Sequence, residues 1–203
     1  MIIAVDGPAA SGKGTLARRL AAYFNLKHLD TGSLYRGVAF GVLHAGGDPS
    51  VEADAVAAAQ IVQDQDLSNP ELRDEMVGNA ASKVARFPAV RRVLLDYQRQ
   101  VAAAGAVLDG RDIGTVVCPD ADHKLFVTAS LETRAERRIS ELTARGIQVL
   151  PDEIRAEMAD RDRQDRERET SPLLQAPDAH LLDTTNLDID SAFSFALALI
   201  EQN

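Results

Sequence analysis

The chain has 203 residues, 45% of them hydrophobic and 26% charged, a composition typical of one α/β domain with room for an inserted subdomain. Its net charge of −9 argues against non-specific binding to nucleic acid, whose phosphates attract basic surfaces. The single cysteine, Cys118, excludes intramolecular disulfides and cysteine-based zinc sites, and it fits a reducing cytosol. No apolar run approaches a membrane span and the N-terminal residues are typical of a strand, so we expect a cytoplasmic protein without a signal peptide or membrane partner.

A phosphate-binding loop is predicted directly after the first strand, which covers residues 1–5. Gly7 and Gly12 bracket four residues and Lys13 follows at once, which is the G-x-x-x-x-G-K pattern. Glycines let backbone N–H groups converge on phosphate oxygens, and the helix that begins near Lys13 adds the positive end of its dipole. We therefore predict that the loop binds ATP phosphates. Its residues are Gly7, Pro8, Ala9, Ala10, Ser11, Gly12, Lys13, Gly14 and Thr15.

The loop departs from the usual pattern at one position. A Ser or Thr normally follows the lysine, and its hydroxyl reaches Mg²⁺. Here Gly14 occupies that position and Thr15 comes one residue later. The variant G-K-G-T resembles the loop of nucleoside monophosphate kinases more than that of GTPases, and it leaves open whether Thr15 contacts the metal or only a phosphate.

The next part of the chain contains one long stretch without a strand. Residues 26–30 are predicted as a short strand, and Asp30 or Thr31 as the cap of the helix that follows. Between 51 and 104 the Ala-rich patterns predict helices only, interrupted by two prolines. This stretch is interpreted as an insertion between the second and third strands of a parallel sheet. The expected helices cover about 56–61, 72–84 and 90–101.

The remaining elements alternate between strand and helix. A helix with three arginines is expected to end at Gly146, and a strongly charged helix follows over 152–169. This alternation predicts a P-loop three-layer α/β fold, in which helices cover both faces of a five-stranded parallel sheet and ligands bind at the strands' carboxyl ends. The remaining strands are expected at 106–110, 124–127 and 179–183, and the closing helix at 189–200. We expect a single domain, 1–203, that divides into a core (about 1–36, 105–130 and 172–203), an insertion that would bind a second substrate, the acceptor (about 37–104), and a lid (about 131–171).

Charged residues at the ends of these elements suggest phosphoryl transfer. Asp109 ends an apolar strand, a pattern that commonly serves a metal's water shell. On the charged helix, Arg161, Asp165 and Arg168 are spaced i, i+4, i+7 and should share one face. An enzyme that moves a phosphoryl group between two anions needs such arginines, because guanidinium is always charged and binds phosphate bidentately. Further arginines that suit this role are Arg36, Arg91 and Arg111.

Two patterns have a purely structural interpretation. On the charged helix, Asp162 with Arg166 and Arg163 with Glu167 are spaced i, i+4, which fits solvated pairs worth about 0.3–0.5 kcal/mol each. His28 and His180 lie in apolar strands and are predicted to pack rather than to bind a ligand.

From end to end the chain resembles the bacterial cytidylate kinases. The string D-G-R-D-x-G-T-V-V at 109–117 is the most specific part of the resemblance, because general monophosphate kinases share the loop but not this string. The resemblance also rests on the segments 6–8, 12–15, 29–32, 35–36, 79–82, 87–88, 90–91, 161–162, 165–166 and 171–173. This chain departs from longer bacterial members between 61 and 72, where they carry a small antiparallel β-sheet, so that sheet is in question here.

The resemblance assigns roles residue by residue. It implies that Arg36, Arg111 and Arg168 hold the acceptor phosphate, that Ser82, Arg91 and Asp112 recognise cytosine, and that Arg161 with Asp165 holds the sugar. The residues it implies for the CMP site are Thr31, Arg36, Ser82, Arg91, Arg111, Asp112, Arg161, Asp165 and Arg168. The expected catalytic residues are Lys13, Arg111, Arg161 and Arg168, and the lid residues expected to face ATP are Arg134, Arg137 and Arg138. Mg²⁺ is expected on Asp109 through water.

We therefore predict a monomeric kinase that transfers the γ-phosphoryl group of MgATP to CMP or dCMP in pyrimidine nucleotide metabolism. Three alternatives stay open from the residues alone. The acceptor is UMP, AMP or a small metabolite such as shikimate; the chain is a non-catalytic nucleotide-binding switch; or it is a nucleic-acid-processing ATPase, which the acidic charge disfavours.

Overall fold

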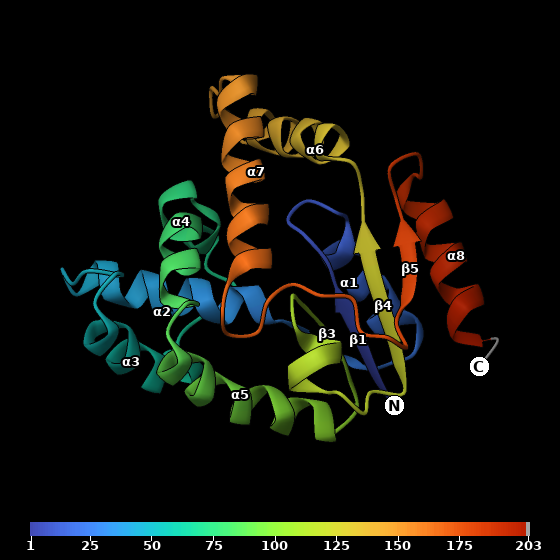
Figure 1. The fold of residues 1–203 in the computed structure, drawn as a ribbon, viewed down its shortest axis with the longest axis horizontal. Helices are drawn as coiled ribbons and strands as arrows, with labels where there is room; N and C mark the ends of the chain where they lie inside the picture. Colours follow the sequence, from blue (N-terminus) through green and yellow to red (C-terminus); the bar gives the residue numbers. More distant parts are fainter. Residues whose placement is uncertain (202–203) are drawn as a thin grey trace. The chain divides into compact units, whose positions relative to one another are not determined.

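The computed structural model describes residues 1–201, and its strands form one sheet in the order β2-β3-β1-β4-β5 (Figure 1). Strand β1 pairs in parallel with β3 and with β4, and β4 pairs in parallel with β5. The predicted α/β fold with a five-stranded parallel sheet is therefore confirmed. The strands are β1 (Ile2–Asp6), β2 (Lys27–Asp30), β3 (Ala106–Gly110), β4 (His123–Thr128) and β5 (His180–Asp183).

Helices connect these strands, and the segment between β2 and β3 is helical where it is regular. The α-helices are α1 (Lys13–Tyr23), α2 (Thr31–His44), α3 (Glu52–Gln60), α4 (Glu75–Val84), α5 (Pro88–Ala103), α6 (Leu131–Ala144), α7 (Pro151–Glu167) and α8 (Ile189–Glu201). The short segments are the 3₁₀ helices η1 (Val62–Asp64) and η2 (Pro70–Arg73) and the π-helix η3 (Ile113–Val117). Residues 51–104, all described, hold no strand, so the antiparallel sheet of longer relatives is absent here.

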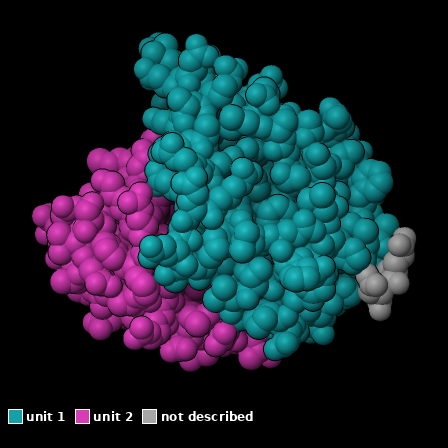
Figure 2. Space-filling view, viewed as in Figure 1, with its two compact units in different colours: residues 1–28, 105–203 teal, residues 29–104 magenta. Residues whose placement is uncertain are grey.

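The chain divides into two compact units, coloured separately in Figure 2. One unit comprises residues 1–28 with 105–203, and the other comprises residues 29–104. The division into core, acceptor-binding insertion and lid stays a prediction.

The first unit is built around the buried strand β1. Ile3, Ala4 and Val5 are completely buried, as expected for a central parallel strand covered on both faces. Helices α1 and α8 pack against one another beside the sheet, and α8 contacts β5. Leu20 of α1 and Ile200 of α8 belong to the same apolar cluster as the strand residues. This core fixes the carboxyl end of β1, where the phosphate loop begins.

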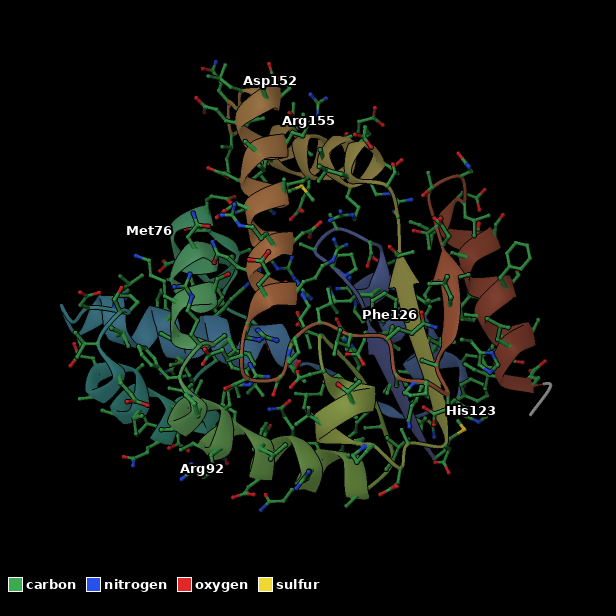
Figure 3. All side chains as sticks on the ribbon, in the orientation of Figure 1. Met76, Arg92, His123, Phe126, Asp152 and Arg155 are labelled. Atoms are coloured by element: carbon green, nitrogen blue, oxygen red, sulfur yellow. The ribbon has the colours of Figure 1, made fainter. Side chains whose placement is uncertain are left out.

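Helices α6 and α7 belong to the same unit and pack against each other through a separate apolar cluster. Ile154 and Met158 of α7 are buried against Leu142 of α6. Elsewhere α7 is charged, and at its N-terminal end Asp152 accepts from Arg155 at the surface (Figure 3). The cluster thus holds one face of α7 and leaves its other charged side chains to bind each other or neighbouring elements.

The two surface pairs predicted on α7 are wrong. Arg163 pairs with Asp160 rather than with Glu167. Asp162 is 7% exposed and accepts hydrogen bonds from Nη1 and Nη2 of Arg134, a residue of α6, instead of pairing with Arg166. A planar guanidinium held bidentately in a buried position gives a better partner than a solvated side chain one turn away.

The second unit is formed by helices. Helix α2 packs on α3 and α4, and α3 packs on α5. Leu34, Val38 and Val42, which lie four residues apart on one face of α2, are buried. Asp30 caps α2, as predicted, by accepting the N–H of Ser33 at 3.2 Å. These contacts hold together the helices that carry the predicted acceptor-binding residues of this unit.

Candidate active site

The phosphate loop has the backbone geometry that its glycines predict. Gly7 has a φ of 154°, and a Cβ there would lie 2.0 Å from the Val127 carbonyl oxygen, so no side chain fits. Gly12 has a φ of 87° and precedes the first residue of α1, Lys13. The positive end of the α1 dipole therefore faces the loop, as a phosphate site requires.

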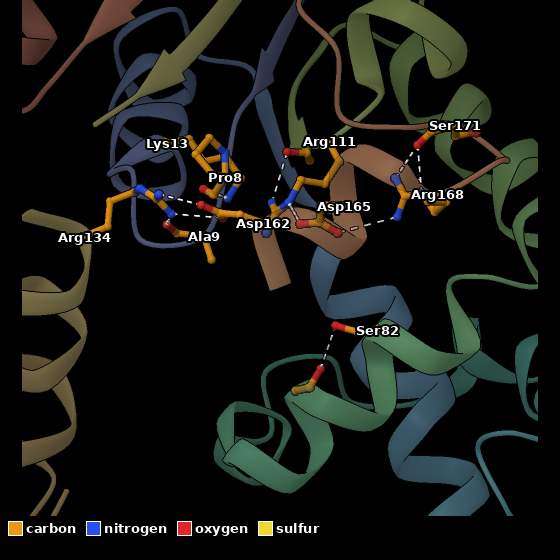
Figure 4. A network of polar contacts seen from close by, with 12 residues as sticks. Pro8, Ala9, Lys13, Ser82, Arg111, Arg134, Asp162, Asp165, Arg168 and Ser171 are labelled. Carbon is orange, nitrogen blue, oxygen red and sulfur yellow. Dashed lines mark hydrogen bonds and ion pairs between the residues drawn. The ribbon is translucent and has the colours of Figure 1, made fainter. Parts of the chain in front are cut away.

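Side chains hold the carbonyl groups of the loop (Figure 4). Lys13 donates to the Pro8 carbonyl at 3.3 Å, and Arg134 of α6 donates to the Ala9 carbonyl at 3.3 Å. The Thr184 hydroxyl lies 2.9 Å from the Ser11 carbonyl. With its carbonyls held in this way, the loop keeps a fixed course between β1 and α1.

Asp109 is the penultimate residue of β3 and lies next to the unusual position of the loop. A Cβ added at Gly14 would lie 3.5 Å from Oδ2 of Asp109, so this carboxylate stands beside the position that carries Ser or Thr in the usual pattern. Oxygen donors are what Mg²⁺ prefers, and it commonly takes one or two carboxylates together with waters and substrate phosphates. In the described part of the chain no cluster of three or more metal-binding side chains exists. One carboxylate beside the phosphate loop fits a Mg²⁺ ion that would be held mainly through water and phosphate.

Asp6 joins the base of the loop to the segment that carries Arg111 and Asp112. Its two carboxylate oxygens accept the N–H groups of Ile113 and Gly114, each at 2.8 Å. Burial raises the pKa of Asp6 to about 7, although the two N–H bonds act in the opposite direction. The clamp fixes the first turn of η3 directly after Asp112.

Three guanidinium groups gather around Asp165, which lies on α7. Arg111 donates through Nε to Oδ2 at 2.7 Å, and Nη1 of Arg168 lies 3.7 Å from Oδ1 (Figure 4). Burial acts to raise the pKa of this carboxyl, but the guanidiniums, led by that of Arg111 and followed by that of Arg161, lower it below its usual value. Three cations around one anion leave a net positive charge, which suits a phosphate ligand.

The predicted helix face is correct for Arg161 and Asp165 but wrong for Arg168. Helix α7 ends at Glu167, and Arg168 has an extended ψ of 129°. Its Nε then donates to the Ser171 carbonyl at 2.9 Å. Arg168 thus reaches Asp165 from the loop after the helix rather than from the helix face.

The three predicted lid arginines have different surroundings. Arg134 bridges the Ala9 carbonyl and Asp162, as described above. Arg137 donates to the hydroxyl and the carbonyl of Thr184, at 3.0 and 2.7 Å. Arg138 pairs with Glu141 at the surface. Two of the three therefore contact the loop or a residue that holds it.

The other predicted acceptor residues lie in the unit 29–104. Thr31 is buried in the first turn of α2, and Arg36 is half-buried on the same helix. Ser82 of α4 donates to the Gly78 carbonyl at 3.4 Å. Arg91 of α5 donates to the Ala85 carbonyl at 3.2 Å, and its guanidinium lies 5.3 Å from the centre of the Tyr35 ring.

Sequence reasoning missed the polar role of two residues. His28 was predicted to pack in its strand, yet its Nε2 lies 2.7 Å from Oδ1 of Asp109. Eighty-one residues separate the two, so no local spacing reveals the pair. Asp6 did carry a signal, because an acidic residue that ends a buried strand needs partners for its oxygens.

A phosphate loop at the end of β1, a carboxylate beside it and a cluster of guanidiniums around Asp165 of α7 define a P-loop phosphotransferase of the nucleoside monophosphate kinase class. The model of the cytidylate kinase family matches residues 3–202, and the chain belongs to this family. The cytidylate kinase of Granulibacter bethesdensis is 57% identical over 203 residues, which are 100% of this chain and 97% of that protein. The cytidylate kinase of Acidiphilium cryptum is 56% identical over 100% of this chain and 96% of that protein.

A solved structure supports the fold independently of the sequence. An uncharacterized protein from Eubacterium ventriosum superposes with a TM-score of 0.61 over 100% of this chain and 99% of its own. At 14% identity this likeness concerns the fold alone. Within residues 1–201, none of the helices has the length and apolar character needed to span a bilayer.

Proposed function

We propose that this protein transfers the γ-phosphoryl group of ATP to CMP or dCMP, giving CDP or dCDP and ADP. The observation that carries the proposal is the guanidinium cluster around Asp165. Arg134 links the helix of this cluster to the phosphate loop, because it binds both Asp162 and the Ala9 carbonyl. A kinase with two anionic substrates needs cations on the acceptor side as well as on the donor side.

In the proposed reaction an oxygen of the acceptor phosphate attacks the γ-phosphorus while the bond to the leaving ADP oxygen breaks. Lys13 offsets charge on the β- and γ-phosphates, and the guanidiniums of Arg111, Arg161 and Arg168 hold the acceptor phosphate and the transferring group. Bound Mg²⁺ supplies further neutralisation of phosphate charge, with Asp109 orienting its water shell. The lid arginines Arg134 and Arg137 help to keep the loop in place and water out.

CMP recognition is assigned to the residues that the resemblance to the cytidylate kinases implies. These residues are Thr31, Arg36, Ser82, Arg91, Arg111, Asp112, Arg161, Asp165 and Arg168. Cytosine presents an exocyclic amino donor beside the acceptors N3 and O2. A carboxylate at Asp112 accepts from the amine, whereas uracil presents an acceptor at that position.

The acceptor is tested with a panel of nucleoside monophosphates and ADP release as the readout. We expect CMP and dCMP to be preferred, and we expect Asp112→Asn to lower the CMP-to-UMP ratio of kcat/KM by about 10- to 100-fold, because an amide donates where the carboxylate only accepts. Preferred turnover of UMP or AMP by the unaltered protein would overturn the cytosine assignment. Release of ADP without dependence on any acceptor would point instead to a nucleotide switch or another ATPase.

The metal assignment predicts a ranking of two variants. Because Gly14 offers no hydroxyl and Asp109 stands beside it, Asp109→Asn should raise the Mg²⁺ concentration for half-maximal activity by about tenfold or more. Thr15→Ala should raise it less. Magnesium titrations at saturating ATP and CMP measure both, and the opposite ranking would assign the metal contact to the loop.

We also propose that the protein works as a monomer in the cytoplasm with small-molecule partners only. The net charge of −9 supports the absence of a nucleic-acid partner. The lone cysteine, which is buried, suits a reducing compartment.

A further inference from the structure

His28 makes a polar contact that neither the phosphate loop nor the acceptor site requires. Its Nε2 lies 2.7 Å from Oδ1 of Asp109. The Asp109 side chain is 4% exposed and that of His28 is 21% exposed, so the contact is shielded from most of the solvent. Both residues belong to the same compact unit.

The chemistry of the two groups fixes the direction of this hydrogen bond. A carboxylate oxygen accepts and has no hydrogen to give, so the imidazole donates from Nε2. A short hydrogen bond to one oxygen removes the freedom of the carboxylate to rotate about its Cβ–Cγ bond. The orientation of the second oxygen is then set as well.

That second oxygen is the one beside the phosphate loop. Oδ2 of Asp109 lies 3.5 Å from the position of a Cβ on Gly14, one residue after Lys13. Oδ1 therefore faces His28 while Oδ2 faces the segment where the phosphates are expected. Carboxylates in metal sites are commonly arranged in this way. One oxygen faces the metal, and the other accepts a hydrogen bond from a residue that does not bind the metal but orients the carboxylate.

We infer that His28 is a positioning residue, whose Nε2–H holds Oδ1 of Asp109 so that Oδ2 is presented to the water shell of the nucleotide-bound Mg²⁺. The inference rests on the proposed metal role of Asp109. A bond that only stabilised the unit would leave the metal affinity unchanged when it is removed. A positioning bond changes the metal affinity.

The test compares His28→Leu, which fills a similar space without a donor, with His28→Gln, which keeps an N–H at a similar reach. Mn²⁺ binding to each protein in the presence of a non-hydrolysable ATP analogue is measured by the loss of the free-ion EPR signal. We expect His28→Leu to weaken Mn²⁺ binding about 10-fold or more and His28→Gln to stay within about threefold of the unaltered protein. Affinity for the analogue in EDTA should be the same in all three. Unchanged Mn²⁺ binding in His28→Leu, or an equal loss in His28→Gln, overturns the inference.

Two further measurements keep the result unambiguous. ¹⁵N NMR of the unaltered protein should show His28 protonated at Nε2, and protonation at Nδ1 alone would contradict the inference even if His28→Leu fails to fold. Asp109→Asn is carried through the same Mn²⁺ titration. If it binds Mn²⁺ normally, the metal role of Asp109 is wrong; if it binds weakly while His28→Leu binds normally, only the role of His28 is wrong. Phosphorylation of CMP, measured separately, tests the proposed function itself.

Discussion

Replacing Arg111 with alanine is expected to lower kcat about 10²- to 10³-fold, the usual cost of removing one charged contact that is made in the transition state. Arg111 follows the buried strand β3 directly, and its guanidinium is held by Asp165 at 2.7 Å and by the Gly110 carbonyl at 3.2 Å. A cation fixed in this way meets developing charge without having to reorganise. The KM for ATP should change little, because the loop around Lys13 is untouched.

The fold should survive this change. Asp165 keeps two cationic neighbours, Arg161 and Arg168, after Arg111 is removed. Arg163→Ala on the same helix is the matched control, because Arg163 is exposed and pairs with Asp160 away from the cluster. Steady-state kinetics with CMP and thermal melting of both variants separate catalysis from stability. An Arg111→Ala protein that stays folded and keeps near-normal turnover would show that the catalytic assignment is wrong.

Local patterns predicted the framework of this site because local physics produces it. The loop between Gly7 and Lys13 can pass close to the Val127 carbonyl oxygen because Gly7 has no Cβ, which would collide with that oxygen. The parallel sheet follows from apolar strands that alternate with helices, and β3 ends at the predicted residues with Asp109 buried. In each case the signal lies within a few residues of the feature that it predicts.

The long-range partners escaped sequence reasoning for the converse reason. Asp162 has an arginine one turn away, yet it binds Arg134, 28 residues earlier in the chain. His28 lies in an apolar strand and binds Asp109. The packing of the helices and strands decides which distant side chain contacts a buried carboxylate. Spacing along the chain does not predict that packing.

Three buried carboxylates each connect two parts of the unit that carries the phosphate loop. Asp109, Asp162 and Asp165 are each buried, and each accepts a hydrogen bond from a guanidinium or an imidazole ring in another part of the chain. Buried acidic groups without such partners would be costly. With them, each carboxylate joins two elements in the unit that carries the phosphate loop.

Asp6 differs from these carboxylates because the hydrogen bonds described for it come from backbone N–H groups and not from side chains. Its replacement is therefore expected to have a large effect on stability. Asp6→Asn should lower the free energy of unfolding by about 1–3 kcal/mol at pH 5, since the amide NH₂ faces the N–H of Ile113 or Gly114 and leaves one of them without an acceptor. The size of this loss should depend on pH, because only the aspartate titrates.

The direction of the pH dependence follows from the raised pKa. Burial raises the pKa of Asp6 from 3.8 to about 7 in the folded protein. Well below pH 3.8 the carboxyl is protonated in both states; as the pH rises towards 7 the unfolded chain releases the proton while the folded chain retains it. The contribution of Asp6 to the free energy of unfolding therefore falls, by about 4 kcal/mol in all and by about 2–3 kcal/mol between pH 5 and pH 8.

Urea denaturation of the unaltered protein and of Asp6→Asn at pH 5, 6, 7 and 8 measures this fall as a difference, in which the other titrating groups cancel. We expect the advantage of the unaltered protein to shrink with rising pH and to level off above pH 7. A constant difference from pH 5 to pH 8 would mean that the pKa of Asp6 in the folded protein is at or below its ordinary value. A constant difference would also mean that the two N–H bonds offset or outweigh burial, so that the clamp between the phosphate loop and η3 is an ionised one.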